Sequence, residues 1–151
     1  MKLNHPAIQG LVLVIVVGAM LSAGGVQPVA AAEPAGVAPE HRVIACYFHR
    51  TQRCPTCRKI GAYVEEAVET GFAEEIRQGR VSVRLIDFQD PKNRKYTESY
   101  KITGPTLVLI DVHDGKVAAW RPAPKVWSLV GDKEAFFQYV QDGVRDYLEH
   151  R

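Results

Sequence analysis

The stretch Arg50–Ile60, RTQRCPTCRKI, decides how the rest of the chain is interpreted. It contains Cys54 and Cys57, with Pro55 and Thr56 between them. The pair is surrounded by the basic residues Arg50, Arg53, Arg58 and Lys59. This CxxC spacing is compatible with a redox-active dithiol, with part of a metal site and with a structural disulfide. The neighbouring sequence must therefore distinguish among these three uses.

The segments on either side place the two cysteines where a strand leads into a helix. Arg42–Phe48, RVIACYF, is a short apolar run with β-branched and aromatic residues, which predicts a buried strand. After the cysteines, apolar residues recur at helical spacing on one stripe: Cys57, Ile60, Val64, Ala67 and Val68. Pro55 falls in the first turn of this helix, where its missing N–H is tolerated.

The remaining chain predicts three more strands and two more helices. Arg80–Phe88 reads as a strand whose apolar end is deeply buried, and a short helix follows from Pro91. Thr106–Val112 is a third strand, and Asp114-Gly115 predicts a hairpin into a fourth. Asp132 can cap a last helix with the apolar stripe Phe136, Phe137, Val140, Val144, Tyr147 and Leu148. The predicted order is β-α-β-α-β-β-α, with the first two strands parallel and the hairpin antiparallel.

This order, with CxxC at the first helix and GPT (104–106) before the third strand, resembles the thioredoxin fold over Arg42–Leu148. The resemblance implies an α/β, three-layer architecture with a mixed four-stranded sheet flanked by helices. Two stretches, CYFHRTQRCPTCRKIGAYVEEAV (46–68) and VWSLVGDKEAFFQYV (126–140), resemble more narrowly a family of small exported thioredoxin-like proteins, labelled ArsF-like subunits of a nitrophenyl-compound nitroreductase.

Thiol–disulfide exchange requires a thiolate near neutral pH and a second thiol that can resolve the mixed disulfide. Cys54 is predicted at the helix N-terminus, where free N–H groups, the helix dipole and nearby arginines favour negative charge. We therefore predict that Cys54 is the exposed nucleophile and that Cys57, one turn further along the apolar stripe, is the resolving thiol. Pro55 and Thr56 stiffen the turn between them.

The resemblance implies further site residues. It implies a cis peptide bond before Pro105 and a groove for an extended partner chain formed by Thr103, Gly104 and Pro105, next to Pro55 and Thr56. Thioredoxins carry a buried acid six residues before the nucleophile.

Phe48 occupies that position in this chain, which puts direct general-base help in doubt. His49 is a candidate substitute.

Two other uses of these residues stay open. His49, Cys46, Cys54 and Cys57 could supply four ligands to zinc or copper, which would make the protein a metal carrier. Alternatively, the chain could be a non-catalytic interaction module with a thioredoxin-like shape. A structural disulfide closing so short a loop would contribute little stability. We expect Cys46 to be a small buried apolar residue, Trp127 to be a packing residue, and His41 and His113 to be solvated loop residues.

The first residues are unlike the rest of the chain. Gly10–Leu21 is a nearly unbroken apolar run, shorter than the about 20 residues of a membrane span. Small residues at Ala30, Ala31 and Ala32 suit signal cleavage. We predict a signal peptide or membrane anchor at residues 1–32, a linker at 33–41 and one domain at 42–151, exported to the periplasm or another extracytoplasmic space.

Charge and motifs limit the partners. The formal net charge is only +2, with the basic residues scattered outside the cysteine region, which argues against a nucleic-acid partner. No nucleotide or flavin motif is visible, so no organic cofactor is implied. The expected partners are proteins with thiols or disulfides, including a membrane or periplasmic redox donor.

Overall fold

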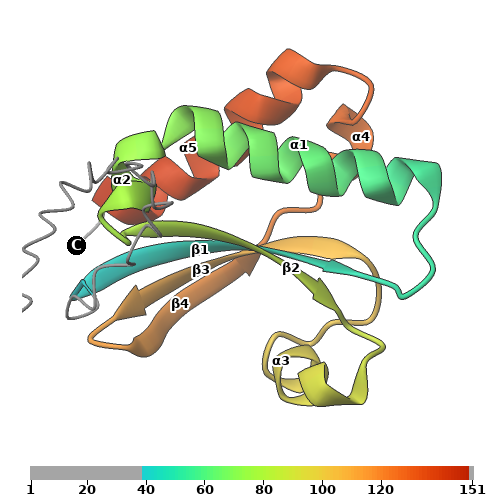
Figure 1. The fold of residues 1–151 in the computed structure, drawn as a ribbon, viewed down its shortest axis with the longest axis horizontal. Coiled ribbons are helices and arrows are strands. Elements are labelled where there is room, and N and C mark those ends of the chain that lie inside the picture. Colours follow the sequence, from blue (N-terminus) through green and yellow to red (C-terminus); the bar gives the residue numbers. More distant parts are fainter. Residues whose placement is uncertain (1–38, 150–151) are drawn as a thin grey trace, which may run out of the picture. The chain divides into compact units, whose positions relative to one another are not determined.

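The computed structural model describes residues 39–149. The predicted signal segment, residues 1–32, lies outside the described residues, as does most of the predicted linker. The elements, labelled in Figure 1, are β1 His41–His49, α1 Pro55–Gly71, α2 Ala73–Arg77, β2 Val81–Asp87, a 3-10 turn Pro91–Asn93, α3 Arg94–Ser99, β3 Thr106–His113, β4 Lys116–Pro122, α4 Val126–Leu129 and α5 Lys133–Glu149. The predicted order is confirmed, and the short helices α2 and α4 are additional to it.

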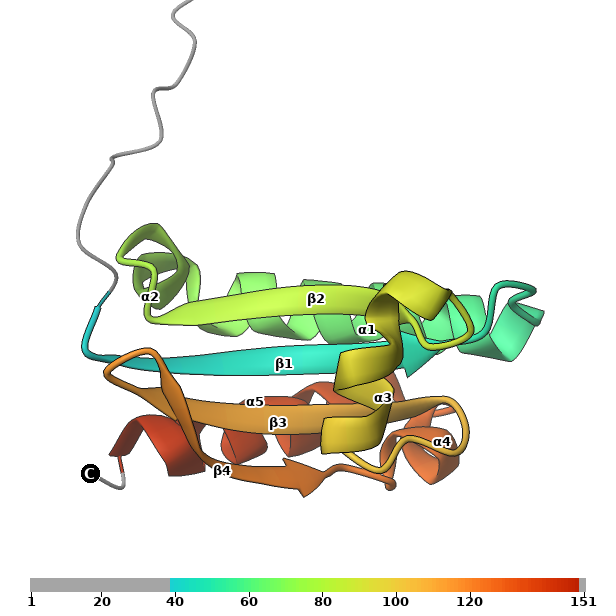
Figure 2. The ribbon, with the colours of Figure 1, turned by 90° about the horizontal axis from the view of Figure 1, so that it is seen from below.

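The sheet has the strand order β2-β1-β3-β4. β1 pairs in parallel with β2, antiparallel with β3, and β3 pairs antiparallel with β4. Figure 1 shows α1, α2 and α5 on one side of the sheet and α3 on the other, and Figure 2 shows α3 crossing the strands from that second side. This mixed sheet between two helical layers is the thioredoxin-like fold that the sequence predicts.

The main core lies between the sheet and the pair of long helices. The buried apolar stripes of α1 and α5 pack against every second residue of the strands, because successive side chains of a strand point to opposite faces of the sheet. Phe136 on α5 is fully buried and packs edge-on against Tyr63 of α1, with ring centroids 5.4 Å apart. The strand residues of this core include Val43, Ala45, Tyr47, Val81, Leu107 and Leu109.

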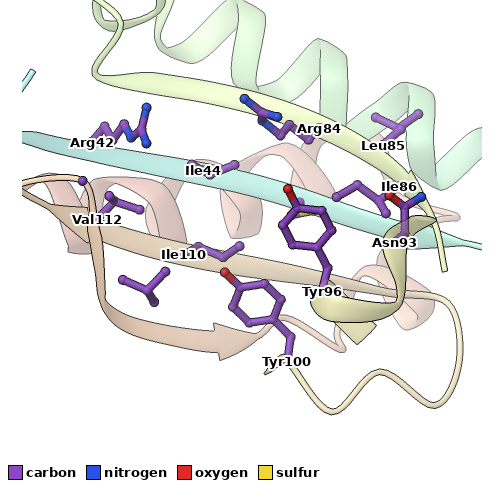
Figure 3. Close-up of a pocket in the computed structure, with 13 residues that line it drawn as sticks. Arg42, Ile44, Arg84, Leu85, Ile86, Asn93, Tyr96, Tyr100, Ile110 and Val112 are labelled. Atoms are coloured by element: carbon purple, nitrogen blue, oxygen red, sulfur yellow. The ribbon is translucent and has the colours of Figure 1, made fainter. Parts of the chain in front are cut away.

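A second, smaller core covers part of the opposite face of the sheet. Its buried members are Cys46, Phe48, Val108, Ile110 and Val112. Tyr96 of α3 and Tyr100, which directly follows α3, pack against them. Because α3 is short and is the only α-helix among residues 39–149 on this face, it covers only part of it. A hollow of about 530 Å³ lies on this face. Figure 3 shows its lining, with Tyr96 and Tyr100 beside the apolar residues Ile44, Ile110 and Val112, and with Arg42 and Arg84 nearby.

Strand β2 differs from its prediction. Leu85 and Ile86, in the apolar end that the sequence predicts to be deeply buried, are only partly buried. The reason is topological: β2 is an edge strand, and among residues 39–149 its only neighbouring strand is β1. Apolar composition alone cannot distinguish an edge strand from a central one.

The predicted hairpin turn at Asp114-Gly115 and the predicted helix cap at Asp132 are both confirmed. Asp114 and Gly115 both have positive φ, 51° and 75°, as a two-residue turn of this kind requires. Asp132 accepts a hydrogen bond from the Ala135 N–H (3.1 Å) at the start of α5. None of the helices within residues 39–149 combines the length and apolarity of a membrane span.

Candidate active site

Cys54 is the N-cap residue of α1, and its side chain performs the capping. Its Sγ accepts a hydrogen bond from the Cys57 N–H at 3.1 Å. The Sγ atoms of Cys54 and Cys57 lie 2.7 Å apart in hydrogen-bonding contact, and both cysteines are free. Cys54 is exposed, whereas Cys57 is 7% exposed. The helix thus presents one sulfur to solvent and holds the second behind it.

The surroundings shift the pKa values of the two thiols in opposite directions. The hydrogen bond from the Cys57 side chain, followed by the Cys57 backbone N–H, lowers the pKa of Cys54; Arg58 adds a smaller favourable charge. Burial raises the pKa of Cys57, and the hydrogen bond to Cys54 raises it further. A single negative charge shared by the pair therefore resides on Cys54, the thiol that a partner can reach.

Tyr47 is the side chain of β1 that lies beneath the cysteine pair. Its hydroxyl is buried and has no hydrogen-bond partner within residues 39–149. Burial raises the pKa of Tyr47, and the nearby Cys57 raises it further. The hydroxyl is therefore protonated at neutral pH and can act as a hydrogen-bond donor but not as a base.

Phe48 stands six residues before Cys54, at the position of the buried acid of thioredoxins. Its side chain faces away from the cysteines. It belongs to the small core on the other side of the sheet, together with Cys46. His49 Nδ1 lies 3.0 Å from the carbonyl oxygen of Arg50. In the pairing of β1 with β2, His49 lies opposite Asp87 of β2. The role of His49 as a substitute base stays a prediction.

Arg53 fills the space between α1 and the end of the sheet. Its Nη2 lies where a Cβ at Gly61 would be, so the absence of a side chain at Gly61 makes room for this guanidinium. The Nε atom of Arg53 is buried without a hydrogen-bond partner in the described part of the chain. Its charge partly opposes the rise in the pKa of Tyr47. Arg53 thus places positive charge beside Tyr47.

Cys46 is a buried residue, as predicted. It is 2% exposed, and burial raises its pKa to about 12, with the Arg84 charge opposing the shift. A buried thiol with so high a pKa is not a nucleophile at neutral pH.

The residues predicted to bind a partner gather at the same end of the sheet. Pro55 and Thr56 are exposed at the start of α1. Thr103, Gly104 and Pro105 precede β3, whose first residue pairs with the end of β1. A Cβ at Gly104 would meet nothing within 4 Å, which leaves this backbone accessible. Thr103, Gly104 and Pro105 line a shallow hollow of about 350 Å³, to which Pro55 and Thr56 do not contribute.

Trp127 has a role that packing alone does not describe. It is 38% exposed, and its indole N–H donates a hydrogen bond of 3.1 Å to the carbonyl oxygen of Pro105. The bond ties α4 to the loop before β3. A helix of four residues is too short to be predicted from its composition. A tryptophan in so short a segment is nevertheless a visible sign in the sequence that the segment has a specific contact.

The alternative metal site predicted from Cys46, His49, Cys54 and Cys57 is not assembled. Cys46 packs on the opposite side of the sheet from Tyr47, which adjoins Cys57. Within residues 39–149, the one group of three or more potential metal ligands in close proximity is His41, Asp111 and His113.

Comparisons with known proteins gave limited similarity. No protein-family model matches the chain. No curated protein matches it by sequence either. Among solved structures, the oxidized thioredoxin O2 of Arabidopsis thaliana is 16% identical, with a TM-score of 0.37, and the match covers 64% of this chain and 76% of that one. A thioredoxin from Thermus thermophilus is 20% identical, with a TM-score of 0.37 and coverage of 73% and 85%. The thioredoxin-like fold therefore stands on the sheet order and helix placement of this chain itself.

Proposed function

We propose that this protein is an extracytoplasmic thiol–disulfide oxidoreductase that relays electrons between protein partners through Cys54 and Cys57. One observation carries the proposal: an exposed sulfur caps a helix N-terminus and is hydrogen-bonded to a second, buried sulfur. A dithiol catalyst needs this asymmetry, because one thiol must react with the partner while the other waits.

The reaction follows from this arrangement. The Cys54 thiolate attacks one sulfur of a partner disulfide, forming a Cys54–partner bond and releasing the other partner sulfur as a thiolate, which takes up a proton. Cys57 then loses its proton and attacks Cys54 Sγ, so that the intramolecular disulfide forms and the second partner thiolate leaves. Two electrons pass to the partner disulfide, and the two cysteines become oxidised. With a dithiol partner, the same steps run in reverse.

Tyr47 supports the second step. Its protonated hydroxyl lies next to the Cys57 sulfur, where negative charge develops during resolution. A hydrogen bond to a charged sulfur is stronger than one to a neutral thiol, so this contact favours the charged state over the resting state.

We expect Tyr47→Phe to slow release of the partner from the mixed disulfide by about 10- to 100-fold, since a hydrogen bond to a charged group is worth about 1.5–3 kcal/mol. The free energy of unfolding should change little, since the neutral Cys57 thiol of the resting protein is a weak hydrogen-bond acceptor. Single-turnover kinetics and denaturant unfolding measure the two quantities. Tyr63→Phe is the matched control, because Tyr63 packs against Phe136 and should leave both unchanged. Equal release rates for both variants would contradict the role of Tyr47.

The test of the proposed function is alkylation of the reduced protein with iodoacetamide over a range of pH, followed by peptide mapping. Because the pKa of Cys54 is lowered, Cys54 is already a thiolate at pH values where an ordinary thiol, with a pKa of about 8.5, is still protonated. We expect the midpoint of Cys54 labelling to lie below that value and the midpoint for Cys57 above it.

A variant that lacks one positive charge tests the cause of the lowered Cys54 pKa. Arg58→Gln removes a positive charge that favours the Cys54 thiolate, so its labelling midpoint should move to higher pH. Arg84→Gln is the control, because Arg84 acts on Cys46 on the other side of the sheet. Equal, slow labelling of Cys54 and Cys57 in the unmodified protein would overturn the proposal.

The place of action and the final acceptor belong to the same proposal. The apolar run Gly10–Leu21 and the small residues that follow it support export. The resemblance to nitroreductase subunits supports a role in nitroaromatic reduction, in which this chain passes electron pairs to or from another protein. Nitro groups are typically reduced at flavin or metal centres. A pair of cysteine thiols is neither of these. We therefore expect the purified protein, with a dithiol as sole electron source, to leave nitroaromatics unreduced.

The second candidate function is a non-catalytic interaction module. It would use the same exposed residues as the relay, and replacement of the cysteines distinguishes the two. A module would bind its partner equally well after both cysteines become serine. A relay would lose the covalent complex with the partner in Cys54→Ser.

A further inference from the structure

His41, Asp111 and His113 meet at the end of the sheet opposite to the cysteine pair. His41 opens β1, and its partner across the strands is His113 in β3. Asp111 lies two residues before His113, so both side chains emerge on the same face. That face is the one covered by α1 and α5, because Val43, two residues after His41, belongs to the main core. The expectation that His41 and His113 are solvated loop residues is wrong, since strand pairing brings both onto Asp111.

The contacts within the group are close. His41 Nε2 lies 2.9 Å from Asp111 Oδ1, and His113 Nε2 lies 3.2 Å from Oδ2. The two imidazole rings are stacked, with centroids 4.2 Å apart and an interplanar angle of 17°. Each carboxylate oxygen therefore faces one imidazole nitrogen, and both nitrogens approach the same carboxylate.

The carboxylate is buried without a fixed positive charge. Asp111 is 6% exposed, and the two imidazoles are its only hydrogen-bond or ion-pair partners within residues 39–149. A buried carboxylate is costly unless a cation compensates it, and neither a lysine nor an arginine does so here. A cation bound between the two imidazoles and the carboxylate would supply this positive charge.

We propose that His41, Asp111 and His113 bind one divalent transition-metal ion, for which zinc is the first probe. In a tetrahedral zinc site with bonds of 2.0–2.1 Å, ligand atoms stand about 3.3 Å apart. The two nitrogen–oxygen separations are already near this value, and all three ligand atoms lie within 4.8 Å of one another. Small rotations of the rings would bring the three atoms around one ion. Two imidazoles and one carboxylate suit zinc and its transition-metal neighbours rather than calcium or magnesium, which prefer oxygen ligands.

Solvent can reach a fourth coordination position. The side chain of His113 is 37% exposed, compared with 15% for His41. A surface hollow of about 410 Å³ adjoins the group and is lined by Pro39, Glu40, His41, Arg80, His113 and Asp114. Two carboxylates against one guanidinium leave this hollow favourable to a cation. The ion would join the first residue of β1 to the end of β3, and the proposal does not depend on thiol chemistry at the other end of the sheet.

The experiment must separate this site from the cysteines, because thiolates are also common zinc ligands. Zinc(II) and cobalt(II) are titrated into the full, untagged chain and into Cys54→Ser/Cys57→Ser. We expect both proteins to bind one equivalent at this site. The cobalt complex of the double-serine protein should show a four- or five-coordinate spectrum without thiolate-to-metal charge transfer. Zinc should raise its Tm, because the ion binds only the folded chain.

Single substitutions in the double-serine background locate the site. His113→Ala should weaken zinc binding by about 100-fold or more, since it removes a direct ligand. Asp111→Asn keeps the side-chain shape and should also weaken it. His49→Ala, a histidine outside the group, should bind as the double-serine protein does. The metal-free Tm of each variant reports folding.

Two results would overturn the proposal: no metal bound by the double-serine protein, or unchanged affinity in folded His113→Ala. If neither His113→Ala nor Asp111→Asn folds, the cobalt spectrum and stoichiometry of the double-serine protein decide. The absence of binding there would mean that the three side chains form a hydrogen-bonded imidazole–carboxylate network only.

Discussion

Replacing Cys54 with serine should reduce thiol–disulfide exchange to the rate measured without protein. The serine hydroxyl is not ionised near neutral pH and cannot attack a disulfide, so the first bond of the reaction never forms. The measurement is reduction of a peptide disulfide by the dithiol form, followed by separation of products. Because serine is itself a good N-cap residue, the start of α1 should be preserved in this variant.

The variant Cys57→Ser provides the matched contrast. Cys54 still attacks, but no second sulfur is available to release the partner, so one partner molecule per chain should accumulate as a mixed disulfide. Mass spectrometry under non-reducing conditions detects this species. If Cys54→Ser were the variant that trapped the partner, the assigned order of the two thiols would be reversed.

Phe136→Ala should lower the free energy of unfolding by about 3–5 kcal/mol, the usual cost of removing a fully buried phenylalanine. Phe136 is completely inaccessible to solvent and lies between the two long helices and the sheet. Its edge-on contact with Tyr63 is lost as well. Denaturant unfolding followed by circular dichroism measures the change.

The neighbouring Phe137 is the internal control for this prediction. It also contacts Tyr63, with centroids 5.8 Å apart, but it is only partly buried. Phe137→Ala should therefore cost clearly less. If Phe136→Ala leaves too little folded protein to measure, Phe136→Leu should give an intermediate loss. Equal losses for Phe136→Ala and Phe137→Ala would show that α5 is rotated relative to the described packing.

Local signals in the sequence are sufficient for most of the fold. Helical spacing from Cys57 to Val68, the Asp114-Gly115 turn and the Asp132 cap each depend on residues close in the chain, and each is confirmed. Helices α2 and α4 escape detection because five and four residues are too short to establish a helical period.

Features that depend on strand pairing could not be predicted in the same way. The degree of burial of β2 follows from its place at the edge of the sheet, and the meeting of His41 with His113 follows from register between strands 72 positions apart. At the cysteine site, counting six residues back from Cys54 reaches Phe48, on the wrong side of β1. The alternation of Val43, Ala45 and Tyr47 on one face indicates Tyr47 instead.

The sulfur that caps α1 links the redox state of the protein to the electrostatics of its first helix. In the reduced form, negative charge on Cys54 meets the backbone N–H of Cys57 and the positive end of the helix. Closing the disulfide removes that charge and the favourable interaction with it. Stabilisation confined to the dithiol form shifts the equilibrium toward electron uptake. By this reasoning the Cys54–Cys57 couple has a less negative standard potential than an unperturbed dithiol, and its disulfide is the stronger oxidant.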